Sequence, residues 1–364
     1  MFYTRINGSI LVIAAHVDDC AMTRHSGKLI TVYKAKLNDK FPLTDLRPIN
    51  SLLGIQVTHD QAACTITLSQ KSYINSILSR FSLTDAKAYH TPMVPSSSYS
   101  MCDSPSSPTD LACMRKVPYR KAIGSLMYAA IATHPDIAFA VSTLSRFLEN
   151  PGEAHWQAVK RVFRYLAGTR DHALTYGAEQ HELLGYTDAD RASQEHRHAI
   201  SGFTFLIDGG AVSWMSRKQE LVTLSTVEAE YVAATHAAKE CIWLRRLIGE
   251  LFPSLITRMT LHCDNQAMLT LAVDDNYHAH MKHIDIRYHF IRQCIARKAI
   301  DLVYCLTDDM TADILTKALP QWKVICHGLG LGLRHSSRGV VESGGDKGCM
   351  QQRGTRGALK AHSS

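Results

Sequence analysis

Residues 225–251 read STVEAEYVAATHAAKECIWLRRLIGEL, and the spacing of the apolar residues predicts one long amphipathic helix. Its apolar stripe runs through Ala234, Ala237, Cys241, Leu244, Ile248 and Leu251. Counting back from Ala234 in steps of three and four places Glu230 on this stripe, whereas Glu228 falls on roughly the opposite face. A buried carboxylate is costly unless a positive group neutralises it. Glu230 therefore either belongs to a buried charged site or reaches water from the margin of the stripe, where the helix dipole favours negative charge.

Two strand-like segments also end in acidic residues. Residues 183–191 alternate as a strand, and Asp188 and Asp190 continue one of its faces. A short strand over 259–264 ends in Asp264, at the carboxyl end where α/β sheets bind their ligands. The alternative for Asp264 is a structural one, as the cap of the helix that follows.

A fourth acidic residue, Asp313, lies in the first turn of a short helix for which Thr311 is the expected N-cap. By itself, Asp313 could simply interact with the helix dipole. Taken with Asp188, Glu230 and Asp264, it makes one shared site a better explanation than four separate structural roles.

Six short motifs follow one another along this part of the chain: Gly185–Asp190 (GYTDAD), Ser213-Trp214 with Ser216–Gln219 (SRKQ), Leu224–Ala233 (LSTVEAEYVA), Cys263–Gln266 (CDNQ), Lys282–Arg292 (KHIDIRYHFIR) and Thr311–Pro320 (TADILTKALP). In order and spacing they resemble the ribonuclease H domain of Ty1/copia-type retrotransposon polyproteins. The resemblance implies that the catalytic, metal-binding residues are Asp188, Glu230, Asp264 and Asp313. It makes Asp190 a neighbour rather than a ligand. Arg191, where tryptophan is usual in the family, and the histidine-rich run 193–198 depart from the pattern without removing a ligand.

Such a set of carboxylates suits phosphodiester hydrolysis. Two Mg²⁺ ions about 3.5–4 Å apart can stabilise both the attacking and the leaving oxygen, and hard cations take oxygen ligands. No histidine or cysteine cage is evident. The resemblance therefore implies a Mg²⁺-dependent ribonuclease H-type endonuclease (Mn²⁺ being an alternative ion) that cuts the RNA strand of an RNA–DNA hybrid, recognised through the RNA 2′-hydroxyl.

The front of the chain carries a second motif, Asp18-Asp19, between two strand-like segments. The pair could be an ordinary hairpin turn. It also resembles the Tyr-Val-Asp-Asp motif of the same family's reverse transcriptase palm, with His16 where tyrosine is usual. The third polymerase carboxylate belongs on an upstream strand that is missing before Met1, so we do not expect DNA polymerisation from this chain alone. Further segments that resemble the downstream polymerase are Leu53–Ile55, Leu68–Ile74, Phe81 and Thr91–Met93.

The implied fold class is α/β: a ribonuclease H-like mixed sheet with flanking helices, preceded by a truncated palm and thumb remnant and a helical connection. The expected organisation is a remnant over 1–91, a Pro/Ser linker over 92–118, the connection over 119–177, the ribonuclease H-like domain over 180–320 and a disordered tail over 325–364. Connection helices are expected over 119–133, 135–148 and 153–167. On the last one, Lys160, Arg161 and Arg164 form either a solvated face or a nucleic-acid contact.

Within the ribonuclease H-like domain, turn residues and periodicity predict nine elements. The expected strands are 182–190, 200–207, 210–215, 258–264 and 300–306, and the expected helices are 225–251, 265–273, 283–298 and 311–318.

Composition agrees with this interpretation without establishing it. The 364 residues carry a formal net charge of +7, which suits a polyanionic partner. The ten cysteines show no C-x-x-C spacing, and there is no secretory signal or bilayer-length apolar run. We therefore expect an intracellular protein with no membrane. The resemblance implies a cytoplasmic (virus-like particle) or nuclear location and the remainder of the polyprotein as a partner. A zinc site at His278, His280 and His283 is a weaker alternative.

Two other functional classes remain open. The chain could be a binding relic that grips nucleic acid without cutting it, or a decayed transposon fragment that does not fold.

Overall fold

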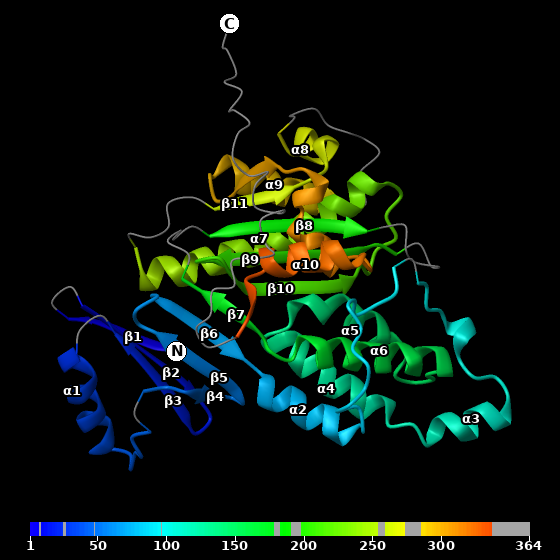
Figure 1. Cartoon of the computed structure of the whole chain (residues 1–364). Helices are drawn as coiled ribbons and strands as arrows, with labels where there is room; N and C mark the ends of the chain where they lie inside the picture. The colour runs from blue at the N-terminus through cyan, green and yellow to red at the C-terminus, as the bar shows by residue number, and fades with distance from the viewer. Residues whose placement is uncertain are drawn as a thin grey trace, which may run out of the picture.

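The computed structural model describes residues 1–6, 9–24, 27–46, 48–95, 97–177, 183–190, 198–253, 259–273 and 285–336. These residues form three β-sheets and several groups of helices (Figure 1). Asp285 and Ile286 are placed in the backbone only.

The first sheet has the strand order β10-β9-β8-β11-β12. Its strands are β8 (Leu184–Asp190), β9 (Ile200–Ile207), β10 (Gly210–Lys218), β11 (Thr260–Cys263) and β12 (Asp301–Tyr304). The first three form the expected antiparallel meander, and β11 runs parallel to both β8 and β12. The β9–β10 turn lies at Asp208 and Gly209, which both have positive φ, as tight hairpins require. This is the ribonuclease H-like mixed sheet predicted from the sequence, with β8 in its centre.

Helix α7 (Thr226–Leu251) packs along β8 and β9, as the apolar stripe predicts (Figure 1). Its N-cap is Ser225, whose hydroxyl accepts a hydrogen bond from the Glu228 amide at 3.2 Å. Helices α8 (Gln266–Val273) and α9 (Asp285–Ala296) pack against α7 and complete one apolar core. At the other end of α7, Arg5 from the N-terminal sheet donates to the Glu250 carbonyl at 2.6 Å, a favourable place for a cation.

The second and third sheets are built mainly from the front half of the chain, with β13 near its end joining the third. The three-stranded sheet contains β1 (Phe2–Ile6), β2 (Ser9–His16) and β3 (Asp19–Arg24), followed by α1 (Gly27–Asn38). The other five-stranded sheet, in the order β13-β7-β6-β5-β4, contains β4 (Ser51–Leu52), β5 (Ile55–Asp60), β6 (Thr65–Ser69), β7 (His172–Tyr176) and β13 (Leu333–His335). Strands distant in sequence thus complete one sheet.

The connection is helical, as predicted. It contains α4 (Tyr119–Ala132), η2 (Pro135–Ile137), α5 (Ala138–Leu144), η3 (Ser145–Phe147) and α6 (Glu153–Thr169), and α2 (Lys71–Arg80) packs against α6. The expected helix over 135–148 is divided into 3₁₀, α and 3₁₀ segments. A single apolar core joins these helices to the ribonuclease H-like sheet. The Trp214 indole of β10 donates to the Ala130 carbonyl at 2.9 Å across this junction.

Three expected boundaries are wrong. The stretch 92–118 was expected to be a linker by composition, and it holds η1 (Met101–Asp103) and α3 (Pro108–Arg115). The disordered tail was expected from 325, yet α10 (Gln321–Gly330) and β13 occupy 321–335, with Leu331 and Leu333 buried. The short helix expected over 311–318 is the 3₁₀ helix η6 (Thr311–Leu315), and its N-cap is Met310 rather than Thr311. Residues 337–364 lie outside the described residues.

The basic residues of α6 make contacts within the chain, a possibility that the sequence did not suggest. The guanidinium groups of Arg161 and Arg164 lie over the Tyr89 ring, 4.3 and 4.0 Å from its centroid. Arg164 also donates to the Tyr89 hydroxyl at 3.1 Å and Arg161 to Thr91 at 2.8 Å. Lys160 lies 5.8 Å from the Trp156 ring. These contacts hold the segment around residue 89 on α6.

We expect Tyr89→Leu to lower the free energy of unfolding by about 1–2 kcal/mol, because it removes two cation–π contacts. Tyr89→Phe keeps the ring and loses only the hydroxyl, so it should lose less than half of that amount. Urea unfolding followed by circular dichroism measures both. Equal stability of Tyr89→Leu and the wild type would show that these contacts contribute nothing.

None of the helices among the described residues combines the length and the apolar character needed to cross a lipid bilayer.

Candidate active site

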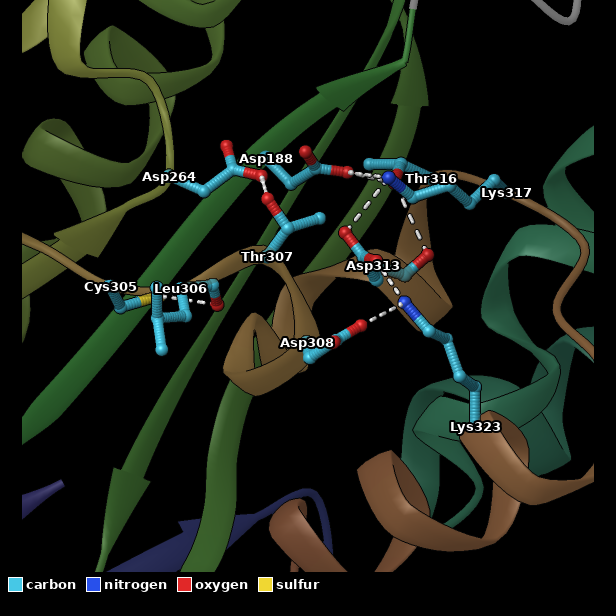
Figure 2. A network of polar contacts seen from close by, with 10 residues as sticks. All are labelled: Asp188, Asp264, Cys305, Leu306, Thr307, Asp308, Asp313, Thr316, Lys317 and Lys323. Carbon is cyan, nitrogen blue, oxygen red and sulfur yellow. Dashed lines mark hydrogen bonds and ion pairs between the residues drawn. The ribbon is translucent and has the colours of Figure 1, made fainter.

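Asp188 lies on the central strand β8 and is 2% exposed. The Thr316 hydroxyl donates a hydrogen bond to its Oδ2, and the Lys317 ammonium lies 3.6 Å from the same oxygen (Figure 2). Burial raises the pKa of Asp188, while Lys317 and Thr316 act to lower it. The aspartate is thus held in a fixed position in the interior, as a ligand would be.

Glu230 lies near the start of α7 and is 5% exposed, so the periodicity argument placed it correctly. The Ala189 amide of β8 donates a hydrogen bond to its carboxylate. Its Oε2 is buried and has no hydrogen-bond partner among the residues that the structure describes. Burial raises the pKa of Glu230 well above its usual value, and the charges of Asp188 and Asp264 raise it further. This carboxylate lacks the compensation that burial requires.

Glu228 corrects the sequence analysis. It was placed on the face opposite to Glu230, yet it is buried at 7% exposure. Its carboxylate accepts a hydrogen bond from the Leu224 amide at 2.7 Å, while its own amide donates to Ser225. The Glu228 side chain thus turns back over the start of the helix and accepts from the residue before the N-cap, so Glu228 is buried by its role in starting the helix.

Asp264 directly follows β11, at the carboxyl end where it was expected, and is partly exposed. The Thr307 hydroxyl donates to its Oδ2 at 2.9 Å (Figure 2). The structural alternative, that Asp264 caps the next helix, is not what the structure shows. Asn265 does so instead, accepting a hydrogen bond from the Met268 amide at 2.9 Å.

Asp313 lies in η6 and is 1% exposed. Lys317 lies 2.9 Å from its Oδ1, and Lys323 lies 4.0 Å from its Oδ2. Burial and the charge of Asp188 raise the pKa of Asp313 to about 7, despite the lowering effect of Lys317. An aspartate that only served a helix dipole would be exposed and unshifted, so Asp313 belongs with the buried acids.

Electrostatic interactions link the four carboxylates, but among the residues that the structure describes only Glu230 and Asp264 belong to a group with metal-ligand spacing, and its third member is Cys263. Asp188 interacts electrostatically with Glu230, Asp264 and Asp313, and Lys317 lies between Asp188 and Asp313 (Figure 2). The donors are oxygen atoms, which suits a hard divalent cation, and the unpartnered Glu230 oxygen is available to it. The residues present fit such an ion. Their role as metal ligands stays a prediction.

Several residues around this cluster escaped the sequence analysis. Lys317 follows Asp313 by four residues, a spacing that could have identified it as an ion-pair partner. Thr316 donates to Asp188, which is 128 positions away in the sequence, and Thr307 donates to Asp264, which is 43 positions away. No local sequence pattern could therefore identify these two threonines. Cys263 also belongs here: its sulfur lies within 4.8 Å of ligand atoms of Glu230 and Asp264.

The Asp18-Asp19 pair lies at the β2–β3 hairpin, where His16 pairs with Asp19 and both aspartates are exposed. Val17, in the turn, has a φ of 53°, unusual for a β-branched residue. The two aspartates are not in any group of three metal-ligand side chains found among the described residues. The zinc alternative at 278–283 and the departures at Arg191 and 193–197 lie outside the described residues.

Comparisons with known proteins identify relatives over most of the chain. Residues 1–95 match the family model of reverse transcriptase (RNA-dependent DNA polymerase). The retrovirus-related Pol polyprotein from transposon TNT 1-94 of Nicotiana tabacum is 40% identical over 316 residues, covering 86% of this chain and 24% of the relative. The corresponding polyprotein from transposon RE1 of Arabidopsis thaliana is 34% identical, covering 88% and 21%. The chain thus spans about a quarter or less of these relatives.

A shorter relative is matched over most of its length. The putative transposon Ty5-1 protein of Saccharomyces cerevisiae is 30% identical over 245 residues, covering 66% of this chain and 77% of the relative. Among solved structures, an RNase H1 isolated from compost (15% identity, 37% of this chain and 93% of that one, TM-score 0.30) and the foamy viral protease-reverse transcriptase (14%, 81% and 36%, TM-score 0.43) are found. On the sequence relatives, the chain belongs to the Ty1/copia-type family of retrotransposon polyproteins.

Proposed function

We propose that this chain carries a Mg²⁺-dependent ribonuclease H activity that cuts the RNA strand of RNA–DNA hybrids. The observation that carries the proposal is Glu230, a buried carboxylate with one unpartnered oxygen, next to Asp188 and Asp264. Leaving a buried charged group unsatisfied costs about 1–3 kcal/mol or more. A divalent cation at this place offsets that cost, and such a cation is what the chemistry needs.

The proposed ligands are Asp188, Glu230, Asp264 and Asp313, with Mn²⁺ able to replace Mg²⁺. When bound, the ions supply positive charge to the phosphate and activate water for attack. The protein's own part is to hold the oxygens in place: Thr316 donates to Asp188, and Thr307 donates to Asp264.

The choice of substrate follows from the neighbouring part of the chain. Residues 1–95 match an RNA-dependent DNA polymerase, and copying RNA into DNA produces an RNA–DNA hybrid. A nuclease on the same polypeptide would meet this product directly. The 2′-hydroxyl gives such an enzyme its means of choosing the RNA strand. The proposed partners are the hybrid and the remainder of the polyprotein.

Asp264→Asn tests the activity with little risk to folding, because Asp264 is partly exposed. We expect it to slow cleavage of a labelled RNA–DNA hybrid in Mg²⁺ by about 10- to 100-fold. Removing a residue that only hydrogen-bonds a metal ligand already lowers activity by that factor. Asp308→Asn is the matched control: Asp308 is exposed, pairs with Lys323 at 3.0 Å and should keep full activity. If wild type and Asp264→Asn cleave at the same rate, the proposed function is wrong.

A binding module without nuclease activity is the second candidate, and the same assay separates the two. It predicts salt-sensitive hybrid binding and no cleavage by the wild type. We do not expect polymerase activity from the chain alone, because Asp18 and Asp19 join no third ligand among the described residues. Extension of a primed RNA template by the purified chain would contradict that expectation. A decayed, unfolded fragment would show no cooperative thermal transition.

A further inference from the structure

Cys263 occupies a place that a Mg²⁺ site does not explain. It is the last residue of β11 and is fully buried, on the same side of the strand as Leu261 and in the same core as α7. Its sulfur lies within 4.8 Å of ligand atoms of Glu230 and Asp264. Among the residues that the structure describes, these three side chains form the one group with metal-ligand spacing.

The three ligand atoms come from two elements that the fold fixes. β11 directs the Cys263 side chain toward α7, and the chain continues directly into Asp264. Helix α7 presents Glu230, whose Oε2 is buried and has no hydrogen-bond partner. That unsatisfied oxygen is a second observation, independent of the cysteine, that a cation belongs at this place.

A thiol changes which cation the place prefers. Mg²⁺ takes oxygen ligands and gains nothing from sulfur. Thiolate ligands select zinc-type ions, for which mixed sulfur and oxygen coordination is ordinary. Small side-chain rotations would bring atoms within 4.8 Å onto one ion, since metal–ligand bonds to sulfur and oxygen are about 2.0–2.3 Å long.

We infer that Glu230, Cys263 and Asp264 form a binding site for a thiophilic divalent cation of the zinc and cadmium class, overlapping the proposed Mg²⁺ site. Binding replaces the S–H bond of Cys263 with a metal–sulfur bond, and the thiol proton passes to the solvent. Such an ion would occupy Glu230 and Asp264 and so exclude Mg²⁺ from them. The inference shares residues with the proposed function but does not require that the chain cleaves a hybrid.

Cd²⁺ is a suitable probe, because a cadmium–thiolate bond gives an ultraviolet charge-transfer band that reports the bond directly. We expect Cd²⁺ added to the full, metal-free chain to produce this band, and Cys263→Ala to remove the contribution of one thiolate. Cys241→Ala is the matched control: Cys241 is a buried thiol of the same core, outside the group, and its loss should leave the Cys263 contribution intact. The four cysteines that are exposed in the described part of the chain contribute equally to every variant.

A second variant keeps the test decisive where Cys263→Ala folds poorly. Asp264→Asn retains the thiol and should raise the Cd²⁺ concentration needed for half of the band by about tenfold or more. Excess Mg²⁺ should raise it as well, because the two ions share ligands. A Cys263→Ala band equal to that of the wild type overturns the inference, and so does unchanged Cd²⁺ affinity in Asp264→Asn. Neither result depends on nuclease activity.

Discussion

Glu230→Gln should make the metal-free protein more stable while it abolishes the proposed cleavage. We expect hybrid cleavage to fall at least about 100-fold, because the substitution removes a proposed ligand whose loss should exceed that of a ligand's partner. We expect the free energy of unfolding without metal to rise by about 1–3 kcal/mol, because a buried charged group without full compensation is replaced by a neutral one of the same size.

The stability effect depends on pH in a defined direction. Burial, followed by the charges of Asp188 and Asp264, raises the pKa of Glu230 above its value in the unfolded chain. Such a group stabilises the folded state fully below its unfolded pKa, and this contribution is lost as the pH rises through the folded value. The metal-free wild type should therefore lose stability as the pH rises above the unfolded pKa of glutamate, about 4.3, and Glu230→Gln should lose less.

Glu228→Gln is the matched control, because Glu228 lies two residues before Glu230 on α7. Glu228 is also buried, but its carboxylate accepts a hydrogen bond from the Leu224 amide. The control should therefore keep cleavage and gain no stability. Urea unfolding in a metal chelator, at several pH values, measures both variants. A Glu230→Gln protein that is less stable than the wild type would show that the carboxylate is already compensated in the folded state, and the case for a metal there would fail.

Local periodicity was enough to place Glu230, because the sheet buries the apolar stripe of α7 from its first turns through Leu244. The same reasoning failed for Glu228, because its hydrogen bond to the Leu224 amide holds the side chain back over the start of the helix, whichever face it occupies. Strand alternation similarly identified Asp188 and Asp264 at positions that the structure brings together. The sequence could thus predict which acids converge, but not which residues compensate them.

Interactions between distant segments account for the remaining errors. The stretch after 325 was expected to be disordered because glycine, arginine and serine dominate it. Its described part, up to residue 336, is ordered because β13 pairs with β7, Leu333 opposite Leu174, and Leu333 is buried in the core of the connection. The sequence gives no measure of such pairing. The same core contains Ile314 and Leu315, which directly follow Asp313, together with residues of the connection and of the ribonuclease H-like sheet.

Lys317→Met should destabilise the metal-free protein, because the Lys317 ammonium neutralises Asp188 and Asp313 as a metal ion would. The ammonium lies 2.9 Å from Asp313 and 3.6 Å from Asp188, and both aspartates are almost fully buried. Removing one partner from buried charges costs about 3–5 kcal/mol. Because the Lys317 side chain is 33% exposed, water screens part of the interaction, and we expect a loss of about 1–3 kcal/mol without metal.

Adding Mg²⁺ should stabilise Lys317→Met more than it stabilises the wild type. An ammonium and a divalent cation cannot both occupy the space between Asp188 and Asp313, so metal binding to the wild type must first displace Lys317. The variant has no such competitor, and an ion that binds only the folded state stabilises it by RT ln(1 + c/Kd) at free ion concentration c, so tighter binding gives a larger stabilisation. The rise in melting temperature with Mg²⁺ should therefore be larger in Lys317→Met than in the wild type.

Lys323→Met separates this competition from a general loss of positive charge. Lys323 lies 4.0 Å from Asp313 and pairs mainly with the exposed Asp308, so its removal should cost at most about 1 kcal/mol. Its response to Mg²⁺ should match that of the wild type, because the space beside Asp188 is unchanged. If both lysine variants respond equally to Mg²⁺, Lys317 does not compete with the metal. If only Lys317→Met gains, the same two carboxylates serve the ammonium in the metal-free state and the ion in the loaded one.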